Sequence, residues 1–308
     1  MILTVCLSPC IDVNIEVDSL GVGKSNTIIS KRIFFTGKAI NVAIGIARLG
    51  ADAFSTGFMY DGNGHQFEIE LHREGVPYKF VWNEGRVREN YKFIDQRSML
   101  TEVNDISAEI TKEKQQELLK LISQISPSYE AVVISGGLAK GMSAEFYGDI
   151  LKAIPNGVKK VVDTEGERLF CSLKYGLDLV KPNLDELERT LKRKIKSKTE
   201  IFDACKELIA MGAKRVLLSL GKKGAIITDG HFSYYSKSVN VAMNSTLGAG
   251  DAMVAAATYA MVKNCPLQDI LKYGVAAGTA SVTSPNSISF SKTKFNEILS
   301  ALSVKEIS

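Results

Sequence analysis

The stretch Asn244-Ser-Thr-Leu-Gly-Ala-Gly-Asp251 leads directly into Ala252-Met-Val-Ala-Ala-Ala-Thr-Tyr-Ala-Met261, a run of strong helix formers. Small residues at the start of a helix leave backbone N–H groups free, and the helix dipole adds roughly half a positive charge at that end. The stretch therefore predicts an anion site. A carboxylate in the first turn, Asp251, can accept a proton from an attacking hydroxyl while the free amides stabilise charge on a transferring phosphoryl group. The alternative is that the glycines only shape a loop and Asp251 only favours the start of the helix.

Short apolar runs of β-forming residues recur along the rest of the chain, with helical patterns between them. Residues 38–48, for example, place apolar side chains at helical spacing, so that one face of a helix is apolar. This alternation predicts an α/β fold in which a mainly parallel sheet is covered by helices. The expected strands are residues 2–7, 53–58, 131–135, 159–163, 177–181, 215–220 and 224–228.

Two regions, residues 11–35 and 86–100, break this rhythm. In the first, Ile11, Val13 and their neighbours alternate with polar residues, and the second is also extended in character. Strands with one exposed face fit this pattern better than core strands do. We therefore expect a small β-sheet appendage that serves as a lid or a dimer surface, and an exposed sheet of this kind suits a homodimer.

Length and composition describe an ordinary globular protein. The chain has 308 residues, of which 45% are hydrophobic and 23% charged, so one large domain with an excursion is expected. No apolar run approaches the roughly 18 residues of a membrane span, and no leader pattern is present, which predicts a cytoplasmic protein. The five scattered cysteines lack a CxxC pair, which argues against a disulfide framework or a zinc site. The net charge of +4 is mild, and the short basic run 192–198 is interpreted as solvated surface rather than a nucleic-acid site.

Thr246-Leu-Gly-Ala-Gly-Asp251 resembles the T-x-GAGD signature of the PfkB family of carbohydrate kinases, and further family segments appear in order over almost the whole chain. The resemblance implies a ribokinase-like three-layer α/β/α sandwich, formed as a single domain from residues 1–308. It places a β lid at about residues 10–36 and 86–103, and it implies ATP and Mg²⁺ without a dedicated protein cage for the metal. By this resemblance Asp251 is the catalytic base, and the amides of Gly248, Ala249 and Gly250 hold the transferring group.

Three segments resemble the family's sugar site. Ser8-Pro-Cys-Ile-Asp12 is similar to an opening strand and turn, and Thr36-Gly-Lys-Ala-Ile-Asn41 to a GGKG-x-N segment. Arg86-Val-Arg-Glu-Asn90 resembles a lid segment of the phosphohexokinase branch, whose arginine grips the substrate phosphate through paired donors. The resemblance thus assigns substrate binding to Asp12, Gly37, Lys38, Asn41, Arg88 and Asn90.

Two further segments resemble the family's nucleotide site. Lys181-Pro-Asn-Leu-Asp-Glu186 matches a KPNxxE segment of the magnesium and phosphate region, and Ser219-Leu-Gly-Lys-Lys-Gly-Ala225 resembles a nucleotide-binding strand and turn. Asn183 followed three residues later by Glu186 also predicts a helix capping box, and both roles can hold together. The resemblance assigns ATP and magnesium binding to Lys181, Asn183, Glu186, Ser219, Gly221 and Gly224.

The branch that the chain resembles contains 1-phosphofructokinases and tagatose-6-phosphate kinases. It implies phosphorylation of a ketohexose phosphate, with fructose 1-phosphate first, tagatose 6-phosphate second and fructose 6-phosphate third. Thr36 and Ala39 stand where the family pattern has glycine, and a Cβ can prevent a positive φ or the close approach of a ligand. These departures leave open a second class of function, a weakly active sugar-phosphate-binding protein on the same fold.

Overall fold

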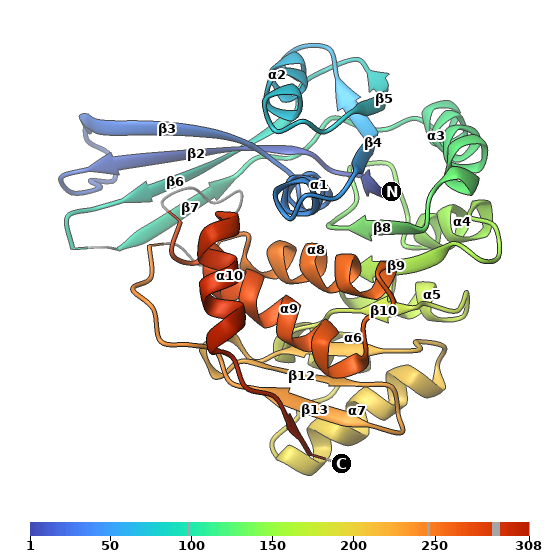
Figure 1. Cartoon of the computed structure of the whole chain (residues 1–308). Coiled ribbons are helices and arrows are strands. Elements are labelled where there is room, and N and C mark those ends of the chain that lie inside the picture. The colour runs from blue at the N-terminus through green and yellow to red at the C-terminus, as the bar shows by residue number, and fades with distance from the viewer. Residues whose placement is uncertain (98, 245–246, 285–289, 308) are drawn as a thin grey trace.

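The computed structural model describes residues 1–97, 99–244, 247–284 and 290–307. A large sheet runs through the body with helices on both of its faces, and a second, smaller sheet projects from one side (Figure 1). The strands of the large sheet are β1 (Ile2–Cys6), β4 (Ala53–Tyr60), β5 (Tyr78–Asn83), β8 (Ala131–Ser135), β9 (Lys159–Asp163), β10 (Leu179–Val180), β11 (Val216–Ser219), β12 (Ala225–Thr228), β13 (Ser233–Ser236) and β14 (Lys305–Glu306).

This sheet has ten strands among the described residues, in the order β14-β13-β12-β11-β10-β9-β8-β1-β4-β5. The strands from β5 to β11 pair in parallel, and β12, β13 and β14 add an antiparallel edge. All seven runs expected to form strands lie in this sheet, so the prediction of a mainly parallel α/β fold is confirmed.

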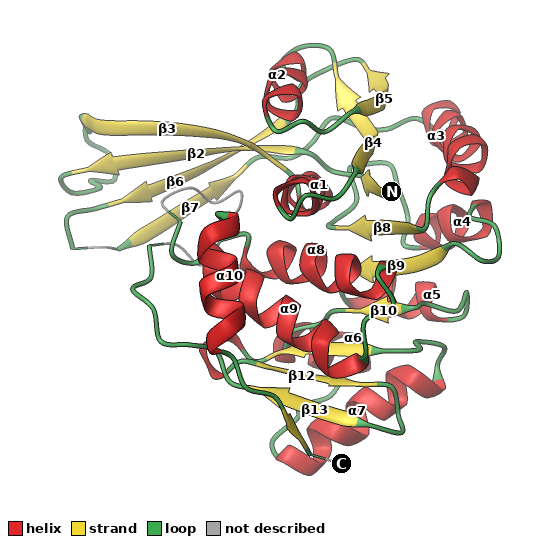
Figure 2. Cartoon of the chain, viewed as in Figure 1, coloured by secondary structure: helices red, strands yellow, loops and turns green. Residues whose placement is uncertain are grey.

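The helices form the two outer layers (Figure 2). One layer contains α1 (Lys38–Arg48), α8 (Ala249–Val262), α9 (Leu267–Ser281) and α10 (Lys292–Ala301). The other contains α3 (Lys112–Ile125), α4 (Glu145–Ala153), α5 (Gly166–Leu173), α6 (Leu184–Leu191) and α7 (Lys198–Ala210). The remaining helical segments are α2 (His65–Arg73) and the 3-10 turns η1 (Ser126–Ser128) and η2 (Gly221–Lys223).

Small side chains explain why α8 lies deep in the body. Almost every residue of this helix is buried, because it packs against α1 and α9 at once. The approach to α1 is so close that a Cβ added to Gly45 would lie 2.8 Å from the Cβ of Ala255. The alanine-rich sequence after Asp251 therefore both favours a helix and lets its neighbours close in on it.

The small sheet consists of β2 (Cys10–Val17), β3 (Ile28–Thr36), β6 (Arg88–Ile94) and β7 (Leu100–Asn104) in the order β3-β2-β6-β7. The central strands β2 and β6 run parallel, and the outer pairs are antiparallel. Because side chains alternate across a strand, Cys10 and Asp12 share one face of this sheet while Ile11 and Val13 share the other. The expected small sheet, separate from the main one, is thus present.

Candidate active site

The carboxyl ends of the parallel strands meet at one edge of the large sheet, where open α/β sheets bind their ligands. Ser8 follows β1, Gly136 follows β8, and Lys181 follows β10, and all three line a cavity of about 850 Å³ between this edge and the small sheet. Every residue assigned to the site from the sequence also lines the cavity: Asp12, Gly37, Lys38, Asn41, Arg88, Asn90, Lys181, Asn183, Glu186, Ser219, Gly221, Gly224, Gly248, Ala249, Gly250 and Asp251.

Asp251 lies in the first turn of α8 with its carboxylate buried. Asn41 Nδ2, from α1, donates a hydrogen bond of 2.8 Å to Asp251 Oδ2. Burial raises the pKa of Asp251 from its ordinary value of 3.8 to about 6, and Asp163 adds to this rise, while Lys38 and the Asn41 hydrogen bond oppose it. The carboxylate is therefore ionised at neutral pH and still binds a proton readily, as a general base must.

The backbone before Asp251 forms the expected helix start. Gly248 is the N-cap residue of α8 in the left-handed region, with φ 74°, which favours glycine. The side chain of Lys181 lies beside Gly250, since a Cβ placed there would lie 3.4 Å from Lys181 Nζ. Free helix amides and an ammonium group thus face the same end of the cavity, a suitable arrangement for a phosphoryl group. Thr246, the first residue of the motif, lies outside the described residues.

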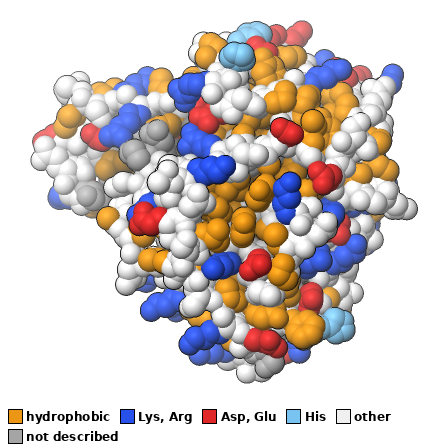
Figure 3. Space-filling model, in the orientation of Figure 1, with side chains coloured by type: hydrophobic (Ala, Val, Ile, Leu, Met, Phe, Trp, Pro, Cys, Tyr) orange, Lys and Arg blue, Asp and Glu red, His pale blue; other side chains and the backbone are white. Residues whose placement is uncertain are grey.

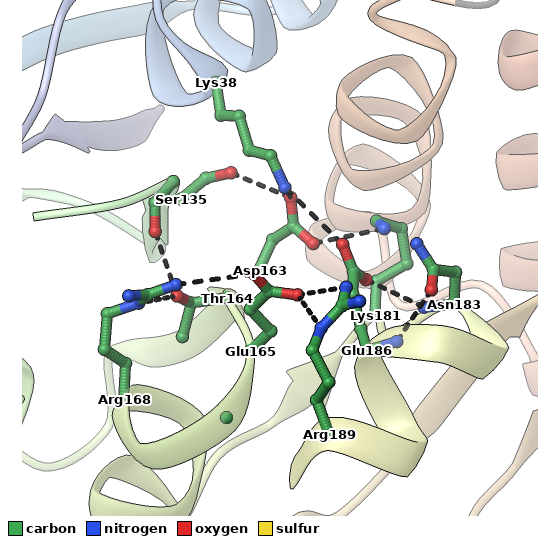
Figure 4. Close-up of polar contacts among 12 residues, drawn as sticks. Lys38, Ser135, Asp163, Thr164, Glu165, Arg168, Lys181, Asn183, Glu186 and Arg189 are labelled. Atoms are coloured by element: carbon green, nitrogen blue, oxygen red, sulfur yellow. Dashed lines mark hydrogen bonds and ion pairs between the residues drawn. The ribbon is translucent and has the colours of Figure 1, made fainter. Parts of the chain in front are cut away.

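Asp163, at the end of β9, is the centre of a buried ionic network (Figure 4). Lys181 Nζ lies 3.1 Å from Asp163 Oδ1, Lys38 Nζ lies 3.7 Å from Asp163 Oδ2, and the Ser135 hydroxyl donates to Asp163 Oδ2 at 2.9 Å. Burial alone would raise the pKa of Asp163, but Lys181 and Lys38 hold it below its usual range. Asp163 in turn is the main reason why the pKa of Lys38 is raised. Both lysine side chains are therefore held beside the Asp163 carboxylate, and both line the cavity.

Asn183 and Glu186 form the capping box that their spacing predicts. The Asn183 side chain accepts from the Glu186 amide, and the Glu186 side chain accepts from the Asn183 amide, each at 2.8 Å. This bond uses Glu186 Oε2, while Glu186 Oε1 lies 3.7 Å from Lys38 Nζ. Glu186 Oε1 therefore lies next to Lys38, on the side of the residue that lines the cavity.

The small sheet forms the opposite wall of the cavity with a chain of polar contacts. Arg88 donates to Asn90 at 3.2 Å, and Asn90 Nδ2 donates to Asp12 Oδ1 at 3.2 Å. Asp12 Oδ2 accepts a 3.4 Å bond from the Thr36 hydroxyl and lies 3.0 Å from Lys92 Nζ. Two polar atoms near the cavity are buried without a hydrogen-bond partner in the described structure, Arg88 Nε and Asn41 Oδ1. The hydrogen-bonding capacity of these two atoms is thus not used by the described residues.

Thr36 and Ala39 fit the backbone at the places where the family pattern has glycine. Within the described residues, the non-glycine positions with positive φ are Lys192 and Asn264, so neither Thr36 nor Ala39 is strained. The glycine that the site needs is Gly37, with φ 154°, where a Cβ would lie 2.9 Å from Cys6 Sγ. The Thr36 hydroxyl bonds to Asp12 and to the Cys10 carbonyl, so it belongs to the polar wall.

The turn between β11 and β12 lies at the far end of the cavity. Gly221 begins η2 with φ 58°, and Gly224 follows it with φ 99°. A Cβ on Gly224 would lie 2.0 Å from the Ser236 carbonyl oxygen, which shows why glycine stands there. Apolar residues of the following loop and of α9, including Val239, Val241 and Val275, line this part of the cavity. A flat apolar ring fits this end of the cavity better than a charged group does.

The residues of the site that were not predicted from the sequence include Asp163, Lys92 and Cys10. Asp163 had a recognisable signal, because it is an acidic residue at the carboxyl end of an expected parallel strand. Lys92 and Cys10 had none, because their positions in the cavity follow from the parallel pairing of β2 with β6, strands far apart in the sequence.

The rest of the chain bears on two other kinds of site, a membrane-spanning segment and a metal centre. On the face shown in Figure 3, acidic and basic side chains are interspersed and apolar side chains lie across the middle. In the described part of the chain, no helix is long and apolar enough to cross a membrane. The same residues contain no group of three or more His, Cys, Asp or Glu side chains arranged to hold a metal ion.

Comparison with known proteins agrees with this geometry. A family model described as pfkB family carbohydrate kinase matches residues 1–294. The chain is 31% identical over 310 residues to a 1-phosphofructokinase of Borreliella burgdorferi, covering 100% of this chain and 99% of that protein. It is 32% identical over 286 residues to a D-tagatose-1-phosphate kinase of Bacillus licheniformis, covering 92% and 93%. It is also similar to the structure of phosphofructokinase-2 from Escherichia coli in complex with fructose-6-phosphate, with a TM-score of 0.89, 28% identity and coverage of 97% and 98%.

Proposed function

The chain belongs to the pfkB family of carbohydrate kinases, and we propose that it transfers the γ-phosphoryl group of ATP to the C6 hydroxyl of fructose 1-phosphate. The product is fructose 1,6-bisphosphate. The observation that carries the proposal is Asp251, a buried carboxylate with a pKa of about 6 in the first turn of α8, beside helix amides and Lys181. The similarity to a 1-phosphofructokinase over the whole chain supports this substrate.

In the proposed reaction, Asp251 accepts the proton of the C6 hydroxyl as that oxygen attacks the γ-phosphorus. The bond between the γ-phosphorus and its bridging oxygen breaks, and the departing ADP keeps the electron pair. The amides of Gly248, Ala249 and Gly250 donate to the oxygens of the transferring group, and Lys181 adds positive charge beside them. Asn41 orients Asp251 through its amide nitrogen, and it lines the cavity beside that carboxylate.

Magnesium fits the residues near α6. Mg²⁺ is commonly held by one or two carboxylates together with phosphates and waters, and Glu186 offers one oxygen that the capping box does not use. We propose that Glu186 holds the ion, through water or directly, with Asn183 fixing the Glu186 side chain. When bound, the ion neutralises charge on the nucleotide phosphates. The turn containing Ser219, Gly221 and Gly224 is proposed to bind the rest of ATP.

The other end of the sugar lies against the small sheet in this proposal. Asp12 and Asn90 hold sugar hydroxyls, Gly37 lets the sugar approach the backbone, and Lys38 bridges the sugar and the phosphoryl group. Arg88 binds the substrate phosphate, because the residue lines the cavity and its guanidinium group offers paired donors. Residues 1–308 are proposed to act as one kinase domain, with residues of about 10–36 and 86–103 as its lid.

A second candidate substrate is tagatose 1-phosphate. The observation in its favour is the 32% identity to a D-tagatose-1-phosphate kinase. It carries its phosphate at the same end as fructose 1-phosphate and differs from it at one ring hydroxyl, so both sugars place C6 toward Asp251 when the phosphate lies at Arg88. Tagatose 6-phosphate and fructose 6-phosphate reverse the sugar and require transfer to C1.

A coupled ADP-release assay with magnesium-ATP tests the proposal against fructose 1-phosphate, tagatose 1-phosphate, tagatose 6-phosphate, fructose 6-phosphate and unphosphorylated fructose. We expect the highest kcat/KM with fructose 1-phosphate and loss of turnover in Asp251→Asn. A higher kcat/KM with another phosphohexose would make that sugar, rather than fructose 1-phosphate, the proposed substrate. Background turnover with all five sugars, from a folded sample that binds fructose 1-phosphate, favours a sugar-phosphate-binding protein.

We also propose a cytoplasmic homodimer that pairs through the small sheet. On the face opposite Asp12, the strand register places Ile33, Val13, Tyr91 and Val103 in one apolar row, with Ile33 47% and Val103 55% exposed. Pairing of two copies would cover this row. Light scattering should give twice the chain mass of 33.6 kDa, and Ile33→Asp should lower it. A wild-type mass of 33.6 kDa contradicts the dimer.

A further inference from the structure

Lys92 occupies an unusual position for a lysine. It lies on β6 with 6% of its surface exposed, and it lines the same cavity as Asp251. Its ion-pair partner among the described residues is Asp12, with Lys92 Nζ 3.0 Å from Asp12 Oδ2. Lysine is seldom buried unless it is paired, and an ammonium group has three donors. Because the contact with Asp12 uses one of these donors, the ammonium group can still donate hydrogen bonds to a molecule in the cavity.

The strand register brings Lys92 and Arg88 to the same face of the small sheet. They stand four residues apart on β6, and residues at i and i+4 of a strand point the same way. The two cationic groups contact the side chains that lie between them. Arg88 donates to Asn90 at 3.2 Å, and Lys92 Nζ lies 3.0 Å from Asp12 Oδ2. Asn90 in turn donates to Asp12 at 3.2 Å. The two cationic heads therefore flank a single Asp12–Asn90 pair.

The charges of this wall favour an anion. Arg88 and Lys92 carry two positive charges and Asp12 one negative charge, so the wall is positive on balance. Without the ammonium group, the Asp12 carboxylate would face a bound phosphate and repel it, since both are negative and like charges in a poorly solvated site are only weakly screened. Arg88 also lines the cavity, and its guanidinium group has five N–H donors, more than its bond to Asn90 uses.

We propose that Lys92 is a specificity-determining residue of the kinase, which together with Arg88 binds the phosphate at the non-reacting end of the ketohexose. The inference rests on the proposed function and adds a residue to it. A phosphate dianion has three terminal oxygens, which matches two cationic donors better than one. Lys92 then does two things: it neutralises Asp12, and it donates to a phosphate oxygen. It thereby selects a phosphorylated sugar over a free one.

Lys92→Met tests the proposal, with Lys31→Met as the matched control. Lys31 is exposed on β3 of the same sheet, paired in register with Ile15 and so on the opposite face. Loss of a hydrogen bond to a charged group should raise the KM for fructose 1-phosphate by about 10- to 100-fold, while kcat stays close to that of the wild type. Inhibition by inorganic phosphate, competing with fructose 1-phosphate at saturating ATP, should weaken by a similar factor. Lys31→Met should change neither value.

Inorganic phosphate tests whether Lys92 affects phosphate binding without any contribution from the sugar hydroxyls. It carries no sugar hydroxyl for Asp12 to hold, so an unchanged inhibition constant in a folded Lys92→Met variant overturns the proposal. The double variant Asp12→Asn/Lys92→Met provides a second test and leaves no unpaired buried charge. It should bind fructose 1-phosphate about 10-fold or more weakly than Asp12→Asn. Equal binding by the two would mean that Lys92 acts only by positioning Asp12.

Failure of this inference can be told apart from failure of the proposed function. If the wild type turns over fructose 1-phosphate and Lys92→Met does so with the same KM, only the inference fails. If the wild type turns over none of the sugars, fructose 1-phosphate can still be tested for a rise in the thermal unfolding temperature. Loss of that rise in Lys92→Met but not in Lys31→Met then supports the inference, and its retention in both overturns it.

Discussion

Asp251→Asn should make the protein inactive and, at neutral pH, more stable. The carboxylate has a pKa of about 6 in the folded protein, compared with its ordinary value of 3.8, chiefly because burial penalises its charge. The difference is about 2 pKa units, and each unit corresponds to about 1.4 kcal/mol, so keeping Asp251 ionised costs the native state about 3 kcal/mol at pH 7.5. Asparagine keeps the shape and an oxygen for Asn41 but carries no charge.

The sign of the pH dependence follows from the direction of this shift. Since the folded protein binds the Asp251 proton more tightly than the unfolded chain does, this group stabilises the wild type below about pH 4. That stability is lost as the pH rises through about 6. The advantage of Asp251→Asn should therefore be largest above pH 7 and vanish near pH 4. At about 2.1 cal/mol/K of unfolding entropy per residue, 3 kcal/mol corresponds to roughly 4–5 °C in the unfolding temperature.

Thermal unfolding of ligand-free protein at pH 7.5 and pH 4 measures this effect, with Asp52→Asn as the control for the same substitution at an exposed residue. In parallel, kcat of Asp251→Asn should fall by about 10²–10⁴, the usual contribution of a general base. The wild-type kcat/KM should decline about tenfold per pH unit below pH 6. A variant no more stable than the wild type at pH 7.5 would refute the argument from burial. An unchanged kcat would show that Asp251 is not the general base.

Three further substitutions test separate parts of the site. Lys181→Met should lower the free energy of unfolding by roughly 3–5 kcal/mol and reduce kcat, because it leaves the buried Asp163 carboxylate without its nearest cation; unfolding equal to that of the wild type contradicts this. Asn183→Ala should lower the free energy of unfolding by about 1 kcal/mol, because the capping box is lost. It should also raise the magnesium concentration needed for half-maximal activity, whereas a purely structural cap would leave that concentration unchanged. Gly37→Ala should destabilise the protein by about 1–3 kcal/mol and weaken fructose 1-phosphate binding, because the new Cβ would lie 2.9 Å from Cys6 Sγ at a φ unfavourable for alanine. Binding as tight as that of the wild type would show that the backbone adapts.

Local sequence patterns predicted the fold well where the pattern is itself local. The runs that became β1, β8 and β9 are short, apolar and separated by helical segments, so their type and parallel arrangement follow from periodicity alone. Three strands of the large sheet were not predicted. β5 (Tyr78–Asn83) is rich in aromatic residues that favour a strand, so its sequence carries a signal that the prediction did not use, whereas β13 and β14 carry little signal. β13 is the short segment Ser233–Ser236 and pairs with the edge of β12, and β14 has only two residues and pairs with β13. Their formation depends on tertiary context rather than on propensity.

The candidate site shows the same division. Asp251, Asn183 and Glu186 carry short-range signals, a helix start and a capping box, which the sequence alone displays. Lys92 shows no such signal, because its contact with Asp12 spans distant strands that pair in parallel. The sequence also raised a doubt about Thr36 that only the backbone could resolve, since φ at that residue is not written in its identity.

Three buried aspartates in or beside one cavity differ in their contacts, and the difference supports the proposal that Asp251 alone is the base. Asp163 and Asp12 each contact a lysine ammonium group, at 3.1 Å and 3.0 Å, whereas Asp251 has the neutral amide of Asn41 as its hydrogen-bond donor. Asp163 and Asp251 are both deeply buried, yet the pKa of Asp163 is lowered and that of Asp251 is raised. Burial is common to both, so the difference comes from the contacting cation. A lysine within 3 Å or so of Asp251 would stabilise the fold and lower the affinity of that carboxylate for a proton. The site thus keeps its lysines on the neighbouring carboxylates, and the lower stability that results at Asp251 is a condition of its reactivity.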